Sequence, residues 1–421
     1  MKRVVITGLG FITSIGNSRP EVLRSLRECR TGVELFSDFA GKDVPVKLAG
    51  TVKGFQFPSP HFDDWTYPAG YQISRDQLRA MTPNALYAFC AMDQAIREAK
   101  LAPELVSNPR TGLMCASGGS MWLAYENLHT IVTRGVSRCP PMAVVNSIPG
   151  SLYINLVAGF KIKGGSLGCS SACSSSAHAL GLAADQIRLH RQEIIFVVGA
   201  EDCNRFNILP FAGIRALSVQ TDPEKSPCAF DIKRDGFVGT GGAAVLVVEE
   251  LEHARRRGVP ICAEVLGWGQ ASDGYNVVIP DPTGDGLRRA IEDTLQDAKL
   301  KPSDVDYVNA HATSTPVGDL SECRALRQVF RGSKLPWVSS TKSLTGHGLS
   351  LAGAMESAIC CLALQERFTP VSAHITELDP ECADIKIVTK PIPDAPRIVL
   401  SNSSGFGGTN VCLAMKKWES N

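Results

Sequence analysis

The most informative stretch of the chain is residues 165–178, which read GSLGCSSACSSSAH. Small residues surround Cys173 there, and the apolar pattern that follows predicts a helix directly after the thiol. A tight strand-to-helix turn of small residues lets a substrate approach closely. The positive end of the helix dipole favours a thiolate over a thiol. We therefore interpret Cys173 as a candidate nucleophile at a helix N-terminus.

Three further segments carry polar groups in unusual settings. They are residues 309–316, NAHATSTP, with His311; residues 340–347, STKSLTGH, with His347; and residues 401–410, SNSSGFGGTN. Taken singly, a cysteine in a serine-rich turn, a histidine in a loop or a glycine-rich turn is usually structural. Their combination in one chain is what indicates chemistry.

Size and composition are those of an ordinary globular enzyme. The 421 residues suffice for two domains or one large duplicated unit. Charged residues make up 20% and the formal net charge is +1, so bulk charge implies neither nucleic acid nor an anionic membrane as a partner. The fourteen cysteines lie singly in apolar segments, except the adjacent Cys360 and Cys361, which favours reduced thiols over a disulfide framework. We expect a cytoplasmic location.

The sequence predicts neither a leader nor a membrane span. Residues 1–8, MKRVVITG, pass directly into a β-branched strand without the apolar core of a signal peptide. Apolar runs such as residues 194–200 and 243–248 are far shorter than the about twenty residues that a bilayer requires. The expected protein is soluble and not exported.

Short β-branched runs alternate with helical patterns along the chain. Three such pairs are residues 3–7 and 21–27, residues 243–248 and 249–257, and residues 305–309 and 320–330. This alternation predicts an α/β protein with mostly parallel, buried strands. The strand at residues 3–7, which ends in Gly8, also resembles the strand at residues 261–266, which ends in Gly267. Two α/β halves are therefore suggested, with a boundary near residues 251–260.

The number of histidines beside the thiol separates two kinds of reaction. One histidine would suggest a hydrolase, in which the imidazole activates the thiol and water later releases the acyl group. Two neutral imidazoles that donate N–H groups to one point stabilise a developing enolate oxygen, which suits carbon–carbon bond formation. Backbone N–H groups of residues 405–408 and of Cys173 are candidates for an oxyanion hole. A buried cation at Lys342 would keep His347 neutral, with Glu356 as the partner of the lysine.

Metal and dinucleotide sites are disfavoured. Cys169 and Cys173 lie close in the sequence, but no second Cys or His pair with zinc spacing follows. Residues 8–13, GLGFIT, begin like the dinucleotide motif G-x-G-x-x-G but have Thr13 at the third glycine. We therefore expect no metal site.

Together these segments resemble the β-ketoacyl-acyl-carrier-protein synthases, the condensing enzymes of the thiolase superfamily. The resemblance covers nearly the whole chain. It runs from residues 5–10, VITGLG, through residues 230–238, FDIKRDGFV, to residues 405–410, GFGGTN. Four separated motifs in the order of the family make the resemblance specific.

Within that family the chain is most similar to the synthase I branch. The similarity lies in residues 248–254, VEELEHA, in residues 311–319, HATSTPVGD, and in Gly119, where the synthase II branch usually carries a bulkier pocket residue. The resemblance implies the thiolase fold, an α/β architecture of five layers, αβαβα, built from two pseudo-symmetric βαβαβαββ halves. The N-terminal half, residues 1–252, would carry the nucleophile, and the C-terminal half, residues 253–421, both histidines.

The mechanism of the family implies a role for each matching residue. Cys173 would take an acyl group from the phosphopantetheine arm of acyl carrier protein, and His311 and His347 would hold the malonyl thioester while carbon dioxide leaves. The N–H groups of Cys173 and Phe406 would form the oxyanion hole, and Phe406 would also act as a gate. Lys342 and Glu356 would support the second histidine. Thr313 and Thr315 would bind the pantetheine arm, and the substrate site would include Gly119, Gly407 and Gly408. The implied function is decarboxylative Claisen condensation to β-ketoacyl-acyl carrier protein in fatty-acid elongation, without a bound cofactor.

The resemblance also implies partners. They are acyl carrier protein and a second subunit, either another copy of this chain or, as the alternative, a ketosynthase-like paralogue. Because the carrier protein is acidic, we expect a basic rim at the mouth of the tunnel. The candidates are Arg75, Arg79, Arg134 and Arg138. Residues 144–156 are expected to complete the acyl pocket of the partner.

Several positions depart from the family pattern. They are Ala312 in place of a glycine in the histidine motif, Ser404 in place of an aromatic residue beside the gate, Ser350 and Leu351 after His347, and the run TGG at residues 240–242. Because Ser404 removes bulk beside the gate, a ketosynthase subunit of a specialised polyene or polyketide pathway, with or without a chain-length partner, stays open. A coenzyme A thiolase is a remoter alternative, since thiolases usually use a second cysteine in place of one histidine.

Overall fold

The strands form one large mixed sheet in the computed structural model, which describes residues 1–419. In the first half of the chain they are β1 (Val4–Ile12), β4 (Thr111–Ala116), β5 (Ser166–Cys169), β6 (Ile194–Glu201) and β7 (Gly242–Glu250). In the second half they are β8 (Ala263–Ser272), β9 (Tyr307–Asn309), β10 (Trp337–Ser339), β11 (Lys386–Ile387), β12 (Ile398–Gly405) and β13 (Thr409–Lys417). A separate small sheet pairs β2 (Val33–Leu35) with β3 (Leu48–Gly50).

The strand order repeats between the two halves. From the centre outward the first half runs β1-β7-β6-β4-β5, and the second runs β8-β13-β12-β9-β10 with β11 added at the edge. At the centre β1 and β8 pair antiparallel, with Val4 opposite Val265. These are the two strands whose similarity is visible in the sequence, and the repeated order confirms two pseudo-symmetric halves. The expected boundary between residues 252 and 253 lies within α10 (Leu251–Arg257), the helix that follows β7.

Half of the pairings in the large sheet are antiparallel, so the prediction of mostly parallel strands is wrong. β4 lies parallel to β5 and β6, but β7 runs antiparallel to both β6 and β1. Helices cover both faces of the sheet, so its antiparallel strands are buried on two sides and show the continuous apolar runs typical of parallel ones. Every residue of β7, for example, is buried.

Helices form three layers around and between the halves of the sheet. In the first half they are α1 (Arg19–Arg27), α2 (Arg75–Ala80), α3 (Pro83–Glu98), α4 (Pro103–Val106), α5 (Met121–Arg134), α6 (Ala143–Asn146), α7 (Ser151–Phe160), α8 (Ser175–Arg188) and α9 (Arg205–Ile208). In the second half they are α11 (Asp285–Ala298), α12 (Pro316–Val329), α13 (Lys342–Thr345) and α14 (Ala352–Glu366). No helix within the described part of the chain has the length and apolarity that a membrane span needs.

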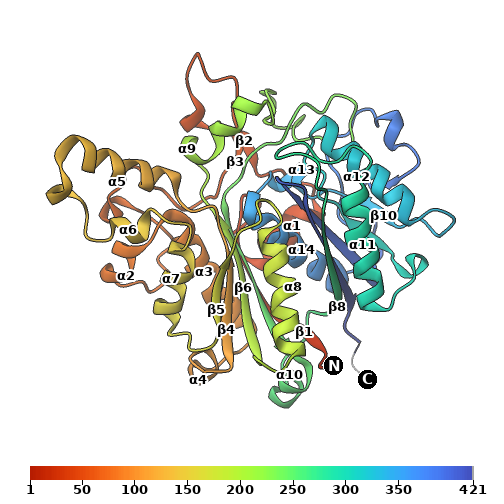
Figure 1. Ribbon diagram of the computed structural model, residues 1–421, viewed down its shortest axis with the longest axis horizontal. Helices are drawn as coiled ribbons and strands as arrows, with labels where there is room; N and C mark the ends of the chain where they lie inside the picture. The colour runs from red at the N-terminus through yellow and green to blue at the C-terminus, as the bar shows by residue number, and fades with distance from the viewer. Residues whose placement is uncertain (420–421) are drawn as a thin grey trace.

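The layers have the predicted αβαβα order. α3 packs on the first half of the sheet, α11 on the second, and α8 and α14 pack against each other between them. Figure 1 shows α3 and α7 on the left, α8 in the centre, and α11 and α12 on the right. Three hydrophobic clusters fill the interfaces of these layers. The predicted fold class is confirmed.

The central layer positions the functional residues. α8 begins two residues after Cys173, and α14 begins five residues after His347. The two helices approach so closely at their N-terminal ends that a Cβ on Gly353 would lie 2.5 Å from the backbone nitrogen of Ala177. The Ser176 hydroxyl accepts a hydrogen bond from the Ala354 N–H at 2.8 Å across this contact. The nucleophile of one half therefore lies beside the histidines of the other.

Candidate active site

Cys173 lies in a tight turn between β5 and α8, as the sequence predicts. The backbone of Ala172 has a φ of +50°, a left-handed conformation that sharpens the turn. The Ser175 hydroxyl accepts a hydrogen bond from the Ser171 N–H at 2.8 Å and donates one to the Ala172 carbonyl at 2.6 Å. The serine-rich composition therefore shapes the backbone that presents the thiol. Cys173 itself is buried.

His347 faces this thiol from the second half of the chain. Its backbone N–H donates to the Val238 carbonyl at 2.7 Å, and its carbonyl accepts from the Thr240 N–H at 3.0 Å. Phe237 packs edge-on against the imidazole, with ring centroids 5.1 Å apart. Held in this way, His347 places Nε2 3.1 Å from Cys173 Sγ.

His311 lies beside His347. Their ring centroids are 5.2 Å apart and the ring planes cross at 85°. The carboxylate of Glu322 on α12 accepts the backbone N–H groups of His311 at 3.0 Å and of Ala312 at 2.7 Å. Glu322 is not predicted from the sequence. The signal available was an acidic pair, Asp319 and Glu322, one helical turn apart directly after the histidine motif.

Burial and the nearby Lys342 cation together set the protonation of both histidines. Lys342 forms an ion pair with Glu356, and both side chains are almost fully buried. Burial, together with this cation, holds the pKa of His347 well below its ordinary range. Burial, the same cation and His347 lower the pKa of His311 in the same way. Both imidazoles are therefore neutral at pH 7, and burial raises the pKa of Glu356 to about 7.

The resting state of the nucleophile is a thiol. Burial raises the pKa of Cys173 to about 12, and the Lys342 cation offsets only part of this effect. The dipole of α8 acts in the opposite direction, toward the thiolate, but removal of a charge from water dominates in the resting site. His347 Nε2, at hydrogen-bond distance, is placed to take the proton when the sulfur reacts.

A cavity of about 350 Å³ reaches the thiol. Its wall includes Cys173, His311, Thr313, Thr315, His347, Ser404, Phe406 and Gly408. The hydroxyl oxygens of Thr313 and Thr315 are 3.2 Å apart there. Gly119 and Gly407 do not line this cavity. A Cβ on Gly119 would lie 3.1 Å from Pro149 Cα, so this glycine lies against the segment 144–156.

The hairpin turn between β12 and β13 brings backbone amides to the thiol. Gly407 has a φ of +81°, which glycine adopts without strain. A Cβ on Gly405 would lie 2.6 Å from the Ser171 carbonyl oxygen and 3.1 Å from the backbone nitrogen of Cys173. Glycine at this position therefore lets the backbone of Phe406 approach the N–H of Cys173, as an oxyanion hole requires.

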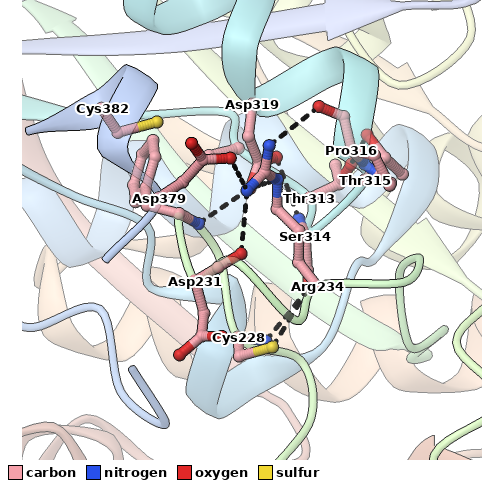
Figure 2. Close-up of polar contacts among 12 residues, drawn as sticks. Cys228, Asp231, Arg234, Thr313, Ser314, Thr315, Pro316, Asp319, Asp379 and Cys382 are labelled. Atoms are coloured by element: carbon pink, nitrogen blue, oxygen red, sulfur yellow. Dashed lines mark hydrogen bonds and ion pairs between the residues drawn. The ribbon is translucent and has the colours of Figure 1, made fainter. Parts of the chain in front are cut away.

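Arg234 anchors the turn that carries the two threonines. Its guanidinium donates to the carbonyls of Pro316 at 3.0 Å and Asp231 at 2.8 Å, and to the Asp379 carboxylate at 2.7 Å. Figure 2 shows the guanidinium among these acceptors. Asp319 completes the cluster, 3.7 Å from Nε. The sequence shows Arg234 only as part of a motif, because its partners come from distant segments.

The four arginines expected at the tunnel mouth lie on the exposed surface of the first half. Arg75 on α2 pairs with Asp63 at 2.7 Å, and Arg134 ends α5. Arg79 and Arg138 are also exposed. None of these four lines the cavity, whereas Arg215 does. In Figure 1, α2 and α5 lie on the side opposite α11 and α12.

Fold and site together define a class of enzyme. A buried thiol, two neutral imidazoles and a close turn of backbone amides meet at one cavity between two pseudo-symmetric halves. Sulfur carries an acyl group in such a site, and the imidazoles stabilise an enolate formed on a second thioester. The class is that of the condensing enzymes with the thiolase fold.

The comparisons with known proteins identify the family. Residues 1–254 match the model of the beta-ketoacyl synthase N-terminal domain, and residues 262–376 match that of the C-terminal domain. The 3-oxoacyl-[acyl-carrier-protein] synthase 1 of Haemophilus influenzae is 40% identical over 425 residues, which cover 99% of this chain and 100% of that protein. The chain belongs to the β-ketoacyl synthase family and is an acyltransferase of the ketosynthase type.

Solved structures agree with this assignment. A beta-ketoacyl synthase from Burkholderia phymatum STM815 superposes with a TM-score of 0.90 at 32% identity, with all of both chains covered. The ishigamide ketosynthase/chain length factor superposes with a TM-score of 0.88 at 27% identity, covering 99% of this chain and 100% of that one. The resemblance seen in the sequence is confirmed.

Proposed function

We propose that this enzyme joins an acyl group held on Cys173 to the malonyl group of malonyl-acyl carrier protein, with loss of carbon dioxide, in fatty-acid chain elongation. The observation that carries the proposal is His347 Nε2 at 3.1 Å from Cys173 Sγ, with a second neutral imidazole beside it. A hydrolase would use one histidine to activate water, whereas two neutral N–H donors suit an enolate. The relationship to a 3-oxoacyl-[acyl-carrier-protein] synthase supports the same substrates.

The first step transfers an acyl group between two sulfurs. Cys173 Sγ attacks the thioester carbonyl of the acyl carrier protein, and the backbone N–H groups of Cys173 and Phe406 stabilise the oxyanion. The thiol proton passes through His347 Nε2 to the departing phosphopantetheine sulfur, so the exchange conserves protons. Because the resting thiol has a pKa of about 12, proton transfer accompanies attack rather than precedes it.

The second step forms the carbon–carbon bond. The carbonyl oxygen of the malonyl thioester accepts hydrogen bonds from His311 and from His347, whose ring carries its proton on Nε2 in this step and on Nδ1 in the first. The carboxylate leaves as carbon dioxide, and the electron pair forms an enolate. The enolate carbon attacks the acyl group on Cys173, the sulfur departs as a thiolate, and a proton from solvent restores the resting thiol. Thr313 and Thr315, on the same cavity wall, hold the pantetheine arm by their hydroxyls. No metal or bound organic cofactor takes part, because both reacting groups arrive as thioesters.

Intact-protein mass spectrometry tests this reaction. The full chain is incubated with a series of acyl-acyl carrier protein thioesters and then chased with malonyl-acyl carrier protein that carries ¹³C in its free carboxyl group. We expect an acyl adduct that disappears on the chase, with the label in carbon dioxide and none in the β-ketoacyl product. Cys173→Ala should give no adduct.

Cys169→Ala is a matched control. Cys169 ends β5 four residues before Cys173 and does not line the cavity, so this variant should form the adduct normally. Release of free acid without a β-keto product would indicate a hydrolase instead. Condensation of two coenzyme A esters without loss of carbon dioxide would indicate a thiolase.

We also propose that a second copy of this chain pairs along β5. This strand ends the sheet, Leu167 on it is 40% exposed, and a hollow lined by Pro149, Tyr153 and Leu167 lies beside it. An apolar, unpaired edge strand favours association. Light scattering should give twice the chain mass for wild type, the chain mass for Leu167→Arg, and twice the mass for Leu189→Arg, a control at an exposed leucine after α8. A monomeric wild type would favour a heterodimer with a paralogue.

The acidic carrier protein would dock on the exposed arginines. Reversal of charge at Arg134 and Arg138 should raise KM for acyl-acyl carrier protein and weaken its dependence on salt, because screened surface charges contribute to association. Acylation by a short pantetheine thioester should stay unchanged. An equal loss with both substrates would exclude docking at these positions.

One feature favours a second candidate, elongation in a polyene or polyketide pathway. Ser404 lies on the cavity wall beside the gate, and its hydroxyl donates to Asn410 Oδ1 at 2.7 Å, so a polar group occupies a place that the family fills with an aromatic ring. The similarity to the ishigamide ketosynthase/chain length factor agrees with this alternative. Polyunsaturated acyl chains are included in the thioester series to distinguish the two candidate functions. Faster acylation with these chains than with saturated chains would favour the specialised pathway.

A further inference from the structure

Two buried cysteines outside the active site lie in contact. Cys323 is on α12, and Cys382 ends the 3-10 turn Pro380–Cys382. Both are fully buried, and their sulfur atoms are 3.1 Å apart. This separation exceeds the length of a disulfide bond by only about 1 Å. Both are free thiols in the structure.

Ion pairs hold the two segments together around the sulfurs. Arg324, next to Cys323, pairs with Glu381 at 2.7 Å. Arg327, one helical turn further along α12, pairs with Asp384 and donates to the Glu381 carbonyl at 2.8 Å. The backbones that carry the two thiols are therefore kept adjacent without a covalent bond.

We propose that Cys323 and Cys382 are a redox pair that closes to a disulfide on exposure to an oxidised low-molecular-weight disulfide such as glutathione disulfide. The sulfur of one cysteine attacks the reagent, whose S–S bond breaks to release one glutathione thiol. The second cysteine then displaces the other glutathione from the mixed disulfide. The two cysteines lose two electrons and two protons, and one glutathione disulfide becomes two thiols.

The bridge would fasten a wall of the catalytic cavity. The first turns of α12 line that cavity, and Glu322, adjacent to Cys323, holds the backbone of His311. On the other side, Asp379 binds Arg234 three residues before Cys382, as Figure 2 shows. A cross-link between residues 59 positions apart also restricts the unfolded chain. The oxidised protein should therefore unfold at a higher temperature than the reduced one.

Peptide mapping without reductant tests the pair directly. The full chain is equilibrated with reduced and oxidised glutathione at graded ratios, both folded and during refolding from urea, then alkylated and digested with trypsin. The refolding arm is needed because hydrogen bonding to Cys382 and burial raise the pKa of Cys323, which slows exchange in the folded state. Peptides 300–324 and 368–386 each contain one cysteine, and the proline after Lys301 prevents cleavage there.

We expect these two peptides to appear joined, two hydrogen atoms lighter than their sum, and to separate on reduction. The joined species should be absent from Cys323→Ala and Cys382→Ala, and oxidation should raise the unfolding temperature of wild type but not of either variant. Mixed disulfides on the half-exposed Cys29 and Cys139 show that the oxidant is active. Modification at those positions without a link between Cys323 and Cys382 in either arm would overturn the proposal. A link that leaves the unfolding temperature unchanged would overturn the inferred fastening of the cavity wall.

Discussion

The ion pair of Lys342 and Glu356 offers a quantitative test of how the site is built. Lys342 is 1% exposed and Glu356 0%, so water has no access to replace a lost partner. Lys342→Met keeps an unbranched side chain of similar length but leaves a buried carboxylate unpaired. At about pH 9, where Glu356 is ionised in the folded protein, we predict a loss of about 3–5 kcal/mol in the free energy of unfolding. The double variant Lys342→Met/Glu356→Gln removes both charges and should recover most of that loss.

Urea unfolding of wild type, both single variants and the double variant measures this coupling. Tryptophan fluorescence follows the transition, and a double-mutant cycle gives the interaction energy. At about pH 9, Lys342→Met within about 0.5 kcal/mol of wild type would refute the reasoning. A double variant no more stable than Lys342→Met would refute it as well, because the unpaired charge would then not be the cause.

The same pair predicts how stability depends on pH. Burial raises the pKa of Glu356 to about 7 in the folded protein, above its ordinary value of 4.5. A carboxyl group with a raised pKa stabilises the fold while it is protonated, so its contribution is present below pH 4.5 and is lost as the pH rises to about 7. Lys342→Met removes the cation and raises this pKa further. The destabilisation of Lys342→Met relative to wild type should therefore grow from about pH 6 to about pH 8.5. A destabilisation independent of pH would contradict the assignment of this titration to Glu356.

Three further predictions concern substrate handling. Gly405→Ala places a methyl group against the Ser171 carbonyl and should slow acylation about 10²-fold. Gly70→Ala, whose methyl group meets no atom within 4 Å, should not slow it. Equal acylation rates for the two variants would exclude this turn as part of the oxyanion hole. Arg234→Lys loses the guanidinium group that binds the Pro316 carbonyl, and it should raise KM for thioesters with kcat retained. A change in kcat alone would contradict the role of Arg234 in positioning the threonines. Ser404→Phe restores bulk beside the gate and should change chain-length preference; an unchanged product distribution would exclude Ser404 as a determinant.

Local features of the site follow from the sequence because they depend on neighbouring residues. Small residues and serines around Cys173 specify a turn in which the Ser175 hydroxyl bonds the backbone of Ser171 and Ala172, and the helix predicted after it is present. The alternation of strands and helices likewise indicates an α/β protein, and the resemblance supplied the layer order. Strand direction could not be predicted, because parallel and antiparallel strands that are buried on both faces show the same apolar runs.

The sequence by itself determined which groups react: a thiol in a turn that presents it, two histidines and a glycine-rich hairpin. Only the tertiary structure decided how they meet, since Cys173 and His347 are 174 positions apart and their contact depends on the packing of α8 against α14. It also decided their protonation, because desolvation is a property of the assembled interior and makes Cys173 a thiol and both histidines neutral. Glu322 and Arg234 gain their roles in the same way, from partners that the folded chain brings to them.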